Sequence, residues 1–318
     1  MAKILDWDAH IGRRVRLRDL RVFFLVVQLG SFAKAAVQLR VSQPAVSRVI
    51  ADLERSLGVR LFDRTTRGVE PTLYGRALLS RGRAAFDELK QGIGEIEVLA
   101  DPGAGEIRIG SHEVLMAGFI PAIIDRLTRE FPRIAFHTVQ ANVLSLHLAL
   151  RERRLDVIIA RRPQSPPGDD LASEKLFDDR QYVVAGLQNR WARRRKIELC
   201  QLLEEAWIVP PPGGVIGSLI AEAFRSKGLA LPKRSIVSDS VPLRNLLLAT
   251  GRYLSLMPGS ALHFAADQLP VKILPVSMPA LIQPTEITVL KNRTLSPVVQ
   301  RFMECCRTVA RLLPGSRP

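Results

Sequence analysis

The chain has 318 residues, of which 47% are hydrophobic and 24% charged. These proportions are typical of globular protein and exclude a disordered chain, and the length predicts two or three domains. The formal net charge is +15, and residues 13–83 contribute fifteen Lys/Arg against five Asp/Glu. A basic N-terminal region indicates a polyanion as partner, although an arginine-rich surface kept only for solubility would give the same count.

The cysteine content excludes a disulfide scaffold. Only Cys200, Cys305 and Cys306 are present, and no pair has the spacing of metal ligands, so they are interpreted as packing residues. No cofactor or metal is expected. Residues 1–19 do not read as a secretory leader, and the longest apolar run, Val22–Val27, is far shorter than a membrane span. The sequence therefore predicts a cytoplasmic protein that contacts no membrane.

Three short helices are predicted before residue 58. The first covers about Arg18–Leu29, and Ser31 can cap the second. Ser42 can cap the third, with Pro44 in its first turn, and Gly58 ends it. Small side chains in the second helix allow a close crossing, as a helix-turn-helix requires. A compact three-helix bundle without DNA binding is the alternative interpretation.

A small hairpin and a long helix are expected next. Residues Leu61–Thr72 contain a turn at Arg67-Gly68, with Arg64 near the same tip. Thr72 can cap a helix over Leu73–Leu99. Its apolar residues recur at intervals of three and four, which predicts a coiled-coil seam that pairs with a second chain. Packing against the helix's own domain is the alternative. The seam consists of Leu79, Gly82, Phe86, Leu89, Ile93 and Ile96.

Beyond a hinge at Asp101-Pro-Gly-Ala-Gly, strands and helices alternate, which predicts parallel strands covered by helices. The predicted strands are Glu106–Gly110, Ile134–Gln140, Leu155–Ala160, Gln181–Gly186, Ala206–Val209, Ser235–Ser238, Leu254–Pro258, Val271–Pro275 and Glu286–Leu290. The predicted helices are Ala117–Glu130, Asn142–Arg153, Leu199–Glu205, Ile216–Lys227, Leu243–Thr250 and Pro297–Leu313.

With these motifs the sequence resembles the LysR-type transcriptional regulators, strongly in the first quarter and moderately beyond it. Two departures are that Arg153 and Tyr253 stand where such proteins often have glycine. The matching residues include Gly30-Ser31-Phe32, Ala35-Ala36, Val41-Ser42-Gln43-Pro44-Ala45-Val46-Ser47, Leu53-Glu54, Leu57-Gly58, Leu61-Phe62, Arg64, Arg67, Pro71-Thr72 and Gly75.

The resemblance implies an α/β protein with an N-terminal, mainly α, winged helix-turn-helix. That domain would cover residues 1–75, and residues 76–105 would form a linker and dimerisation helix with a hinge. An effector-binding domain would cover residues 106–318, built from two α/β subdomains of periplasmic-binding-protein type. Subdomain I would comprise residues 106–163 and 268–318, and subdomain II residues 164–267.

The expected DNA contacts lie on the third helix and the hairpin. Gln43, Ser47 and Arg48 face outward near the helix start, where Gln can pair with adenine and Arg with guanine. The Ser42 side chain could cap the helix or contact a phosphate. Arg64 and Arg67 are expected at the DNA backbone or minor groove. The predicted DNA-binding set is Ser42, Gln43, Pro44, Ser47, Arg48, Arg64 and Arg67.

The expected effector contacts are polar residues at strand ends and helix N-termini, positions that favour an anionic ligand. A Ser or Asn at such a position is more often a plain N-cap than a ligand contact. His112 has no second His or Cys at ligand spacing, so no metal is predicted there. The predicted effector-binding set is Ser111, His112, Gln140, Asn142, Gly213, Gly214 and Ser240.

The sequence thus predicts a DNA-binding transcriptional regulator controlled by a small-molecule effector and not an enzyme. Its partners would be double-stranded promoter or operator DNA, the effector, further copies of the chain as a dimer or tetramer and, as a candidate, RNA polymerase. One rival is an architectural or effector-independent DNA-binding protein. The other is an enzyme fused to a helix-turn-helix, against which no phosphate loop or nucleophile elbow is found.

Overall fold

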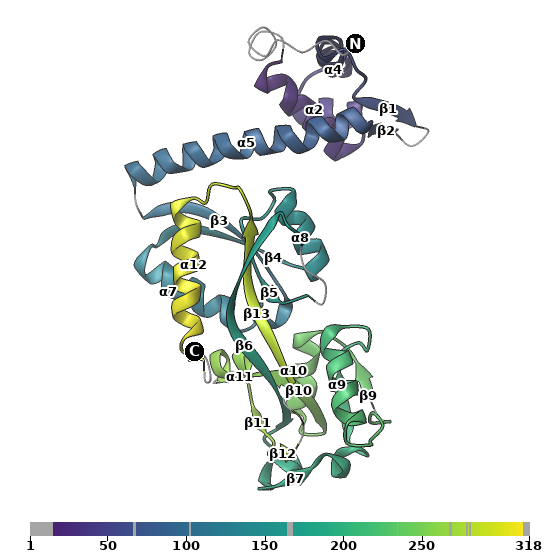
Figure 1. Ribbon diagram of the computed structural model, residues 1–318, viewed down its shortest axis with the longest axis vertical. Coiled ribbons are helices and arrows are strands. Elements are labelled where there is room, and N and C mark those ends of the chain that lie inside the picture. The colour runs from purple at the N-terminus through teal and green to yellow at the C-terminus, as the bar shows by residue number, and fades with distance from the viewer. Residues whose placement is uncertain are drawn as a thin grey trace. The chain divides into compact units, whose positions relative to one another are not determined.

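The computed structural model describes residues 15–65, 68–101, 103–163, 168–233, 235–266, 269–277, 279 and 281–313. Contacts within the chain divide it into two compact units, residues 1–89 and 90–318. Figure 1 labels the elements of both units.

The first unit is a three-helix cluster followed by a hairpin. Its helices are α2 (Leu17–Leu29), α3 (Phe32–Leu39) and α4 (Gln43–Leu57), and its strands are β1 (Phe62–Thr65) and β2 (Gly68–Pro71). The predicted helices and hairpin are confirmed. The serines expected to cap the second and third helices form the capping hydrogen bonds. The hydroxyl of Ser31 accepts from Lys34 N at 3.3 Å, and that of Ser42 accepts from Ala45 N at 3.4 Å.

The core of this unit explains the close helix crossing. Phe23, Val26 and Ala35 are fully buried, and Ala36 is nearly so. Their small or planar side chains let α2, α3 and α4 pack around one apolar centre. That centre consists of Val22, Phe23, Val26, Ala35, Ala36, Val46, Ile50, Leu53, Leu61 and Phe62.

The long helix α5 (Leu73–Ala100) begins where predicted, since Thr72 Oγ1 accepts from Gly75 N at 3.1 Å. The predicted continuous seam is wrong in its first half. Phe86 packs edge-on against Phe24 of α2, with ring centres 5.4 Å apart, and a Cβ at Gly82 would lie 2.6 Å from the same ring. The later seam residues Leu89, Ile93 and Ile96 are 49%, 58% and 66% exposed.

The second unit is built on one mixed sheet of nine strands among the described residues, in the order β4-β3-β5-β13-β6-β10-β8-β9, with β11 also paired to β6. The strands are β3 (Ala104–Ser111), β4 (Arg133–Gln140), β5 (Val157–Arg161), β6 (Leu171–Gly186), β8 (Ala206–Val209), β9 (Ser235–Val237), β10 (Tyr253–Pro258), β11 (Val271–Ile273) and β13 (Leu281–Leu290); β7 (Ile197–Glu198) and β12 (Val276–Ser277) pair separately.

Two long antiparallel strands, β6 and β13, pass through both halves of this unit (Figure 1). The first half contains β3, β4 and β5, which are parallel as predicted. The second half contains β8, β9 and β10, also mutually parallel. The β6–β13 register shifts between Thr285 and Glu286, which marks an irregularity where the strands cross from one half to the other.

The helices lie on both faces of the sheet. They are α6 (Glu113–Met116), α7 (Phe119–Glu130), α8 (Val143–Arg151), α9 (Val215–Arg225), α10 (Val241–Ala249), α11 (Gly259–Phe264) and α12 (Pro297–Ala310), with 3₁₀ turns at Arg190–Arg193 and Leu199–Leu202.

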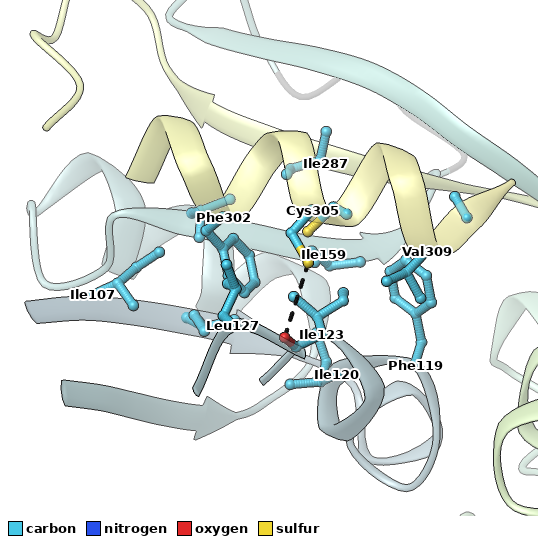
Figure 2. Close-up of a cluster of buried hydrophobic side chains, with 14 of the residues drawn as sticks. Ile107, Phe119, Ile120, Ile123, Leu127, Ile159, Ile287, Phe302, Cys305 and Val309 are labelled. Atoms are coloured by element: carbon cyan, nitrogen blue, oxygen red, sulfur yellow. Dashed lines mark hydrogen bonds between the residues drawn. The ribbon is translucent and has the colours of Figure 1, made fainter. Parts of the chain in front are cut away.

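Alternate residues of β5 reach opposite faces in the first half. Val157 and Ile159 pack with α7 and α12, whereas Ile158 and Ala160 pack with α8. Figure 2 shows α12 laid over α7, where Cys305 Sγ lies 4.0 Å from the carbonyl oxygen of Ile123.

Three sequence predictions are corrected in this unit. The strand expected at Gln181–Gly186 is only the end of the 16-residue β6. The helix expected at Leu199–Glu205 is one 3₁₀ turn. The helix expected to start at Ala117 starts at Phe119, after the separate short helix α6.

Candidate functional sites

The outer surface of α4 presents the predicted base-reading residues. Ser42, Gln43, Pro44 and Arg48 are exposed, and Ser47 is partly so. The apolar side chains of the same helix are buried, which fixes the direction of the outer face. Arg55, which is also exposed, forms an ion pair with Asp52, three residues earlier in the same helix, with Nη1 2.8 Å from Oδ1. Arg48 has no such partner among the described residues, so its guanidinium is available to a ligand.

The hairpin is held to the helices through its backbone N–H groups. Gly30 O accepts from Val69 N at 3.1 Å, and Glu54 Oε1 of α4 accepts from Leu61 N at 2.7 Å and Phe62 N at 3.3 Å. Arg64 lies in β1 with its backbone opposite Val69. Arg67 lies outside the described residues. A wing fixed in this manner stands at a defined angle to α4.

A cleft of about 590 Å³ opens between the two halves of the second unit. It brings together four of the residues predicted for the effector. His112 follows β3, Gln140 ends β4 and Asn142 caps α8, all from the first half, and Gly214 caps α9 in the second half. The carboxyl ends of parallel strands therefore converge at the cleft as predicted.

The hydrogen bonds of these residues differ. Asn142 Oδ1 accepts from Ser145 N at 2.9 Å, so this side chain is a helix cap as well as a cleft residue. Gly214 offers α9 no side-chain cap, and the first residues of this helix line the cleft. Burial, and then the charge of Arg161, lowers the pKa of His112 to about 4. His112 is therefore a neutral imidazole at physiological pH.

The other predicted residues lie apart from the cleft lining. Ser111 is fully buried, and its hydroxyl donates to Ile159 O at 2.6 Å. Gly213 has open space around the position of a Cβ. Ser240 caps α10 and lines a smaller chamber of about 90 Å³. That chamber and the cleft share Val114, Arg161, Pro210, Ile216 and Asp239.

Sequence reasoning missed the charged residues of this region. Arg161 ends β5, one position beyond the predicted strand, Arg162 follows it, and Arg244 lies within α10. Arg162 pairs with Glu286 of β13. A charged residue directly after a buried strand is the one sequence signal that could have indicated Arg161. Nothing in the helical pattern distinguished Arg244 from a solvent-facing arginine.

The cysteines have the environment of packing residues where they are buried. Burial raises the pKa of both the Cys305 and Cys306 thiols. Cys200 is exposed, and all three are unbridged. Within the described part of the chain, no group of three His, Cys, Asp or Glu side chains could hold a metal ion.

Two family profiles match the chain. That of the bacterial regulatory helix-turn-helix proteins of the lysR family covers residues 17–76, and that of the LysR substrate binding domain covers residues 100–311. The chain belongs to the LysR family. It is a LysR-type transcriptional regulator, with a helix-turn-helix and an effector-binding domain, and such regulators bind DNA and small-molecule effectors and form oligomers.

Known LysR-family proteins resemble it over nearly their whole length. The HTH-type transcriptional regulator GbpR of Azospirillum brasilense is 27% identical over 304 residues, which span 93% of this chain and 87% of GbpR. A full-length OxyR variant from Pseudomonas aeruginosa shares the fold with a TM-score of 0.64 at 24% identity, covering 96% of this chain and 97% of that one. CbnR in complex with its target DNA shares the fold with a TM-score of 0.53 at 21% identity, covering 93% and 100%.

In the described ranges, no helix of this LysR-family chain combines the length and apolar character that crossing a membrane demands.

Proposed function

We propose that this LysR-family regulator reads its operator through the outer face of α4. Gln43, Ser47 and Arg48 would contact base edges in the major groove. The observation that carries the proposal is that Arg48 is exposed beside the helix start with no partner among the residues that the structure describes, whereas Arg55 of the same helix is paired with Asp52. Ser42 and Pro44 would set the helix start against the phosphates.

The wing would hold the DNA backbone. Arg64 in β1 and Arg67, three positions later in the sequence, are proposed to contact phosphates or the minor groove, which positions the protein without selecting sequence. The attachment of the wing to Gly30 and Glu54 supports this, because a fixed wing sets one distance from α4 to the backbone.

The test is the sequence preference of Arg48→Ala, measured by selecting operators from random DNA. We expect a loss of about 1–3 kcal/mol of discrimination at one base pair, with other positions unchanged. Arg55→Ala is the matched control, since it removes the same charge from the same helix and should leave the preference intact. An unchanged preference in Arg48→Ala would refute this docking.

The effector would bind in the cleft between the two halves. His112, Gln140, Asn142 and Gly214 would line the site, with Ser240 at the adjoining chamber, and Ser111 and Gly213 remain predictions as further contacts. Gln140→Leu tests this assignment, because the substitution keeps an aliphatic side chain of similar bulk and removes both polar groups. We expect loss of the ligand response with operator binding retained.

The regulator would work in the cytoplasm without enzymatic activity, and copies of the chain would pair through the apolar stripe Leu89, Ile93 and Ile96 of α5. Domain boundaries are proposed at residues 75 and 105. Subdomain I would comprise residues 106–163 and 268–318, and subdomain II residues 164–267.

A further inference from the structure

Beside the cleft lies the smaller chamber of about 90 Å³, which equals roughly the liquid volume of three water molecules. It is too small for a whole metabolite and large enough for one polar group. Both halves of the effector domain contribute to its walls: Arg161 comes from β5 of the first half, and Arg244 from α10 of the second.

The two arginines lack counter-ions in contact. Both side chains are largely buried, and in the part of the chain that the structure describes neither guanidinium forms an ion pair. Arg244 Nε is buried and has no hydrogen-bond partner within the described ranges. Burial, and then the charge of Arg161, lowers the pKa of Arg244 to about 10. Two like charges thus face one chamber, one from each half.

The neighbouring acidic groups are engaged elsewhere or lie at the rim. Asp179 accepts from Ser260 N at 3.0 Å and Ser260 Oγ at 2.6 Å. Glu113 accepts from Val241 N at 3.2 Å, at the start of α10. Asp239 lines both the chamber and the cleft. A buried cation without a contacting partner is unfavourable, so an acceptor from outside would stabilise the site.

A third donor faces the same chamber. Gln181 of β6 lines it, and its Nε2 is buried with no hydrogen-bond partner among the residues described. In folded proteins the large majority of buried amide donors form a hydrogen bond, so a buried donor without a partner needs an explanation. Two guanidinium groups and an amide N–H present donors only, which selects a ligand group that is an acceptor and negatively charged.

We propose, building on the effector site in the cleft, that this chamber binds the carboxylate or phosphate group of the effector and that this group joins Arg161 to Arg244. The body of the ligand would then lie in the cleft toward His112 and Asn142. Without the anion, the two arginines repel each other and favour an open cleft. With it, both are attracted to one charge, and the two halves close.

The experiment uses the full-length protein and thermal shift with three probes: succinate, inorganic phosphate and the neutral sugar glucose. We expect at least one anion to raise the Tm in a concentration-dependent manner and glucose to leave it unchanged. Response to succinate but not to phosphate would assign the chamber to a carboxylate, and the reverse would assign it to a phosphate. No stabilisation by either anion, or equal stabilisation by glucose, would overturn the proposal.

Variants separate this role from a structural one. Arg244→Gln and Arg161→Gln should weaken anion binding at least tenfold. Because Arg244→Gln removes an unpaired buried charge, the Tm without ligand should stay equal or rise, whereas a structural arginine would lower it. Arg225→Gln, an exposed arginine of α9 paired with Glu222, should bind the anion as the wild type does. Unchanged anion affinity in both chamber variants would contradict the assignment.

The failure of this inference and of the effector cleft can be told apart. If a ligand stabilises the protein, and its affinity falls in Gln140→Leu but not in Arg244→Gln, the cleft assignment stands and the anion chamber is refuted. If its affinity is unchanged in both variants, both proposals are refuted.

Closure has its own measurement. Spin labels at Leu144→Cys and Leu246→Cys, on exposed positions of α8 and α10, should approach one another on anion binding in a Cys200→Ser background. An unchanged distance in the anion complex would exclude closure.

Discussion

Gly68 of the wing and Gly30 at the end of α2 approach each other so closely that a Cβ at position 68 would lie 2.5 Å from the Gly30 carbonyl oxygen. Gly68 also has a φ of +138°, a conformation that side chains rarely adopt. Two backbones that meet without side chains fix the wing against the helices. The position of the wing against the helices therefore depends on a contact between two glycine backbones.

Gly68→Ala should displace the wing. We expect a loss of about 1–3 kcal/mol in stability from strain and the close contact, together with weaker binding to all operators alike. Thermal unfolding and operator titration measure both effects. Gly58→Ala is the matched control: it has a φ of +70° and no atom within 4 Å of the added Cβ, so only the backbone strain applies. Equal losses in the two variants would show that the close approach has no role.

The exposed stripe of α5 should decide the oligomeric state. Ile93→Asp with Ile96→Asp places two charges where the side chains are now 58% and 66% exposed, so folding of the monomer should be unaffected. The mass in solution, measured by light scattering, should fall to that of a smaller species. Glu95→Gln, between them in the sequence, should keep the wild-type mass. An unchanged mass in the double variant would place the interface elsewhere.

Stability should fall as the pH is lowered from about 6.5 toward 4 because of His112. Its folded-state pKa of about 4 lies below the usual value near 6.5, so the unfolded chain binds the proton first. The stability that the neutral imidazole contributes is fully present above pH 6.5 and is lost as the pH falls toward 4.

This effect can be isolated by comparing urea unfolding of the wild type and His112→Gln at pH 7 and pH 5. The wild type should lose roughly 2 kcal/mol more than the variant over this interval. Equal losses in the two proteins would mean that the imidazole titrates normally in the folded state.

Replacing Arg153 with glycine should stabilise the folded protein. It has a left-handed φ of +56°, at the position where the sequence departs from the glycine common in LysR regulators. Arg153→Gly relieves this strain and keeps the carbonyl oxygen that accepts from Arg108 Nη1 at 3.2 Å. We expect a gain of about 0.5–1 kcal/mol in denaturant unfolding.

Asn292→Gly at a φ of +53° is the comparison for Arg153→Gly. The gain there should be smaller, since asparagine tolerates this conformation. A loss of stability in Arg153→Gly would show that contacts of the arginine side chain outweigh the strain.

The sequence carried most information where local chemistry decides structure. Ser31, Ser42 and Thr72 act as caps, so helix starts could be placed closely. Polar residues after β3 and β4 could be placed at one cleft, because strand ends in a parallel sheet meet at one edge.

What could not be predicted depends on partners distant in the chain. The first ten residues of β6 include Glu174, Lys175 and Asp178, which resemble a loop, and they form a strand because β13 pairs with them more than a hundred residues later. The seam of α5 is divided by Phe24 for the same reason. Arg244 and Gln181 gain their significance only when two separate halves bring them to one chamber.

The long strands β6 and β13 have a consequence for how this domain can be divided. Because each strand is hydrogen-bonded in both halves, neither half is a contiguous piece of the gene product, and a protein truncated after β5 would lack the strand that completes its own sheet. Expression of either half alone should give insoluble or unfolded material, and the intact domain should melt in a single transition. Recombination with relatives would therefore have to exchange the whole domain, or both crossing strands together.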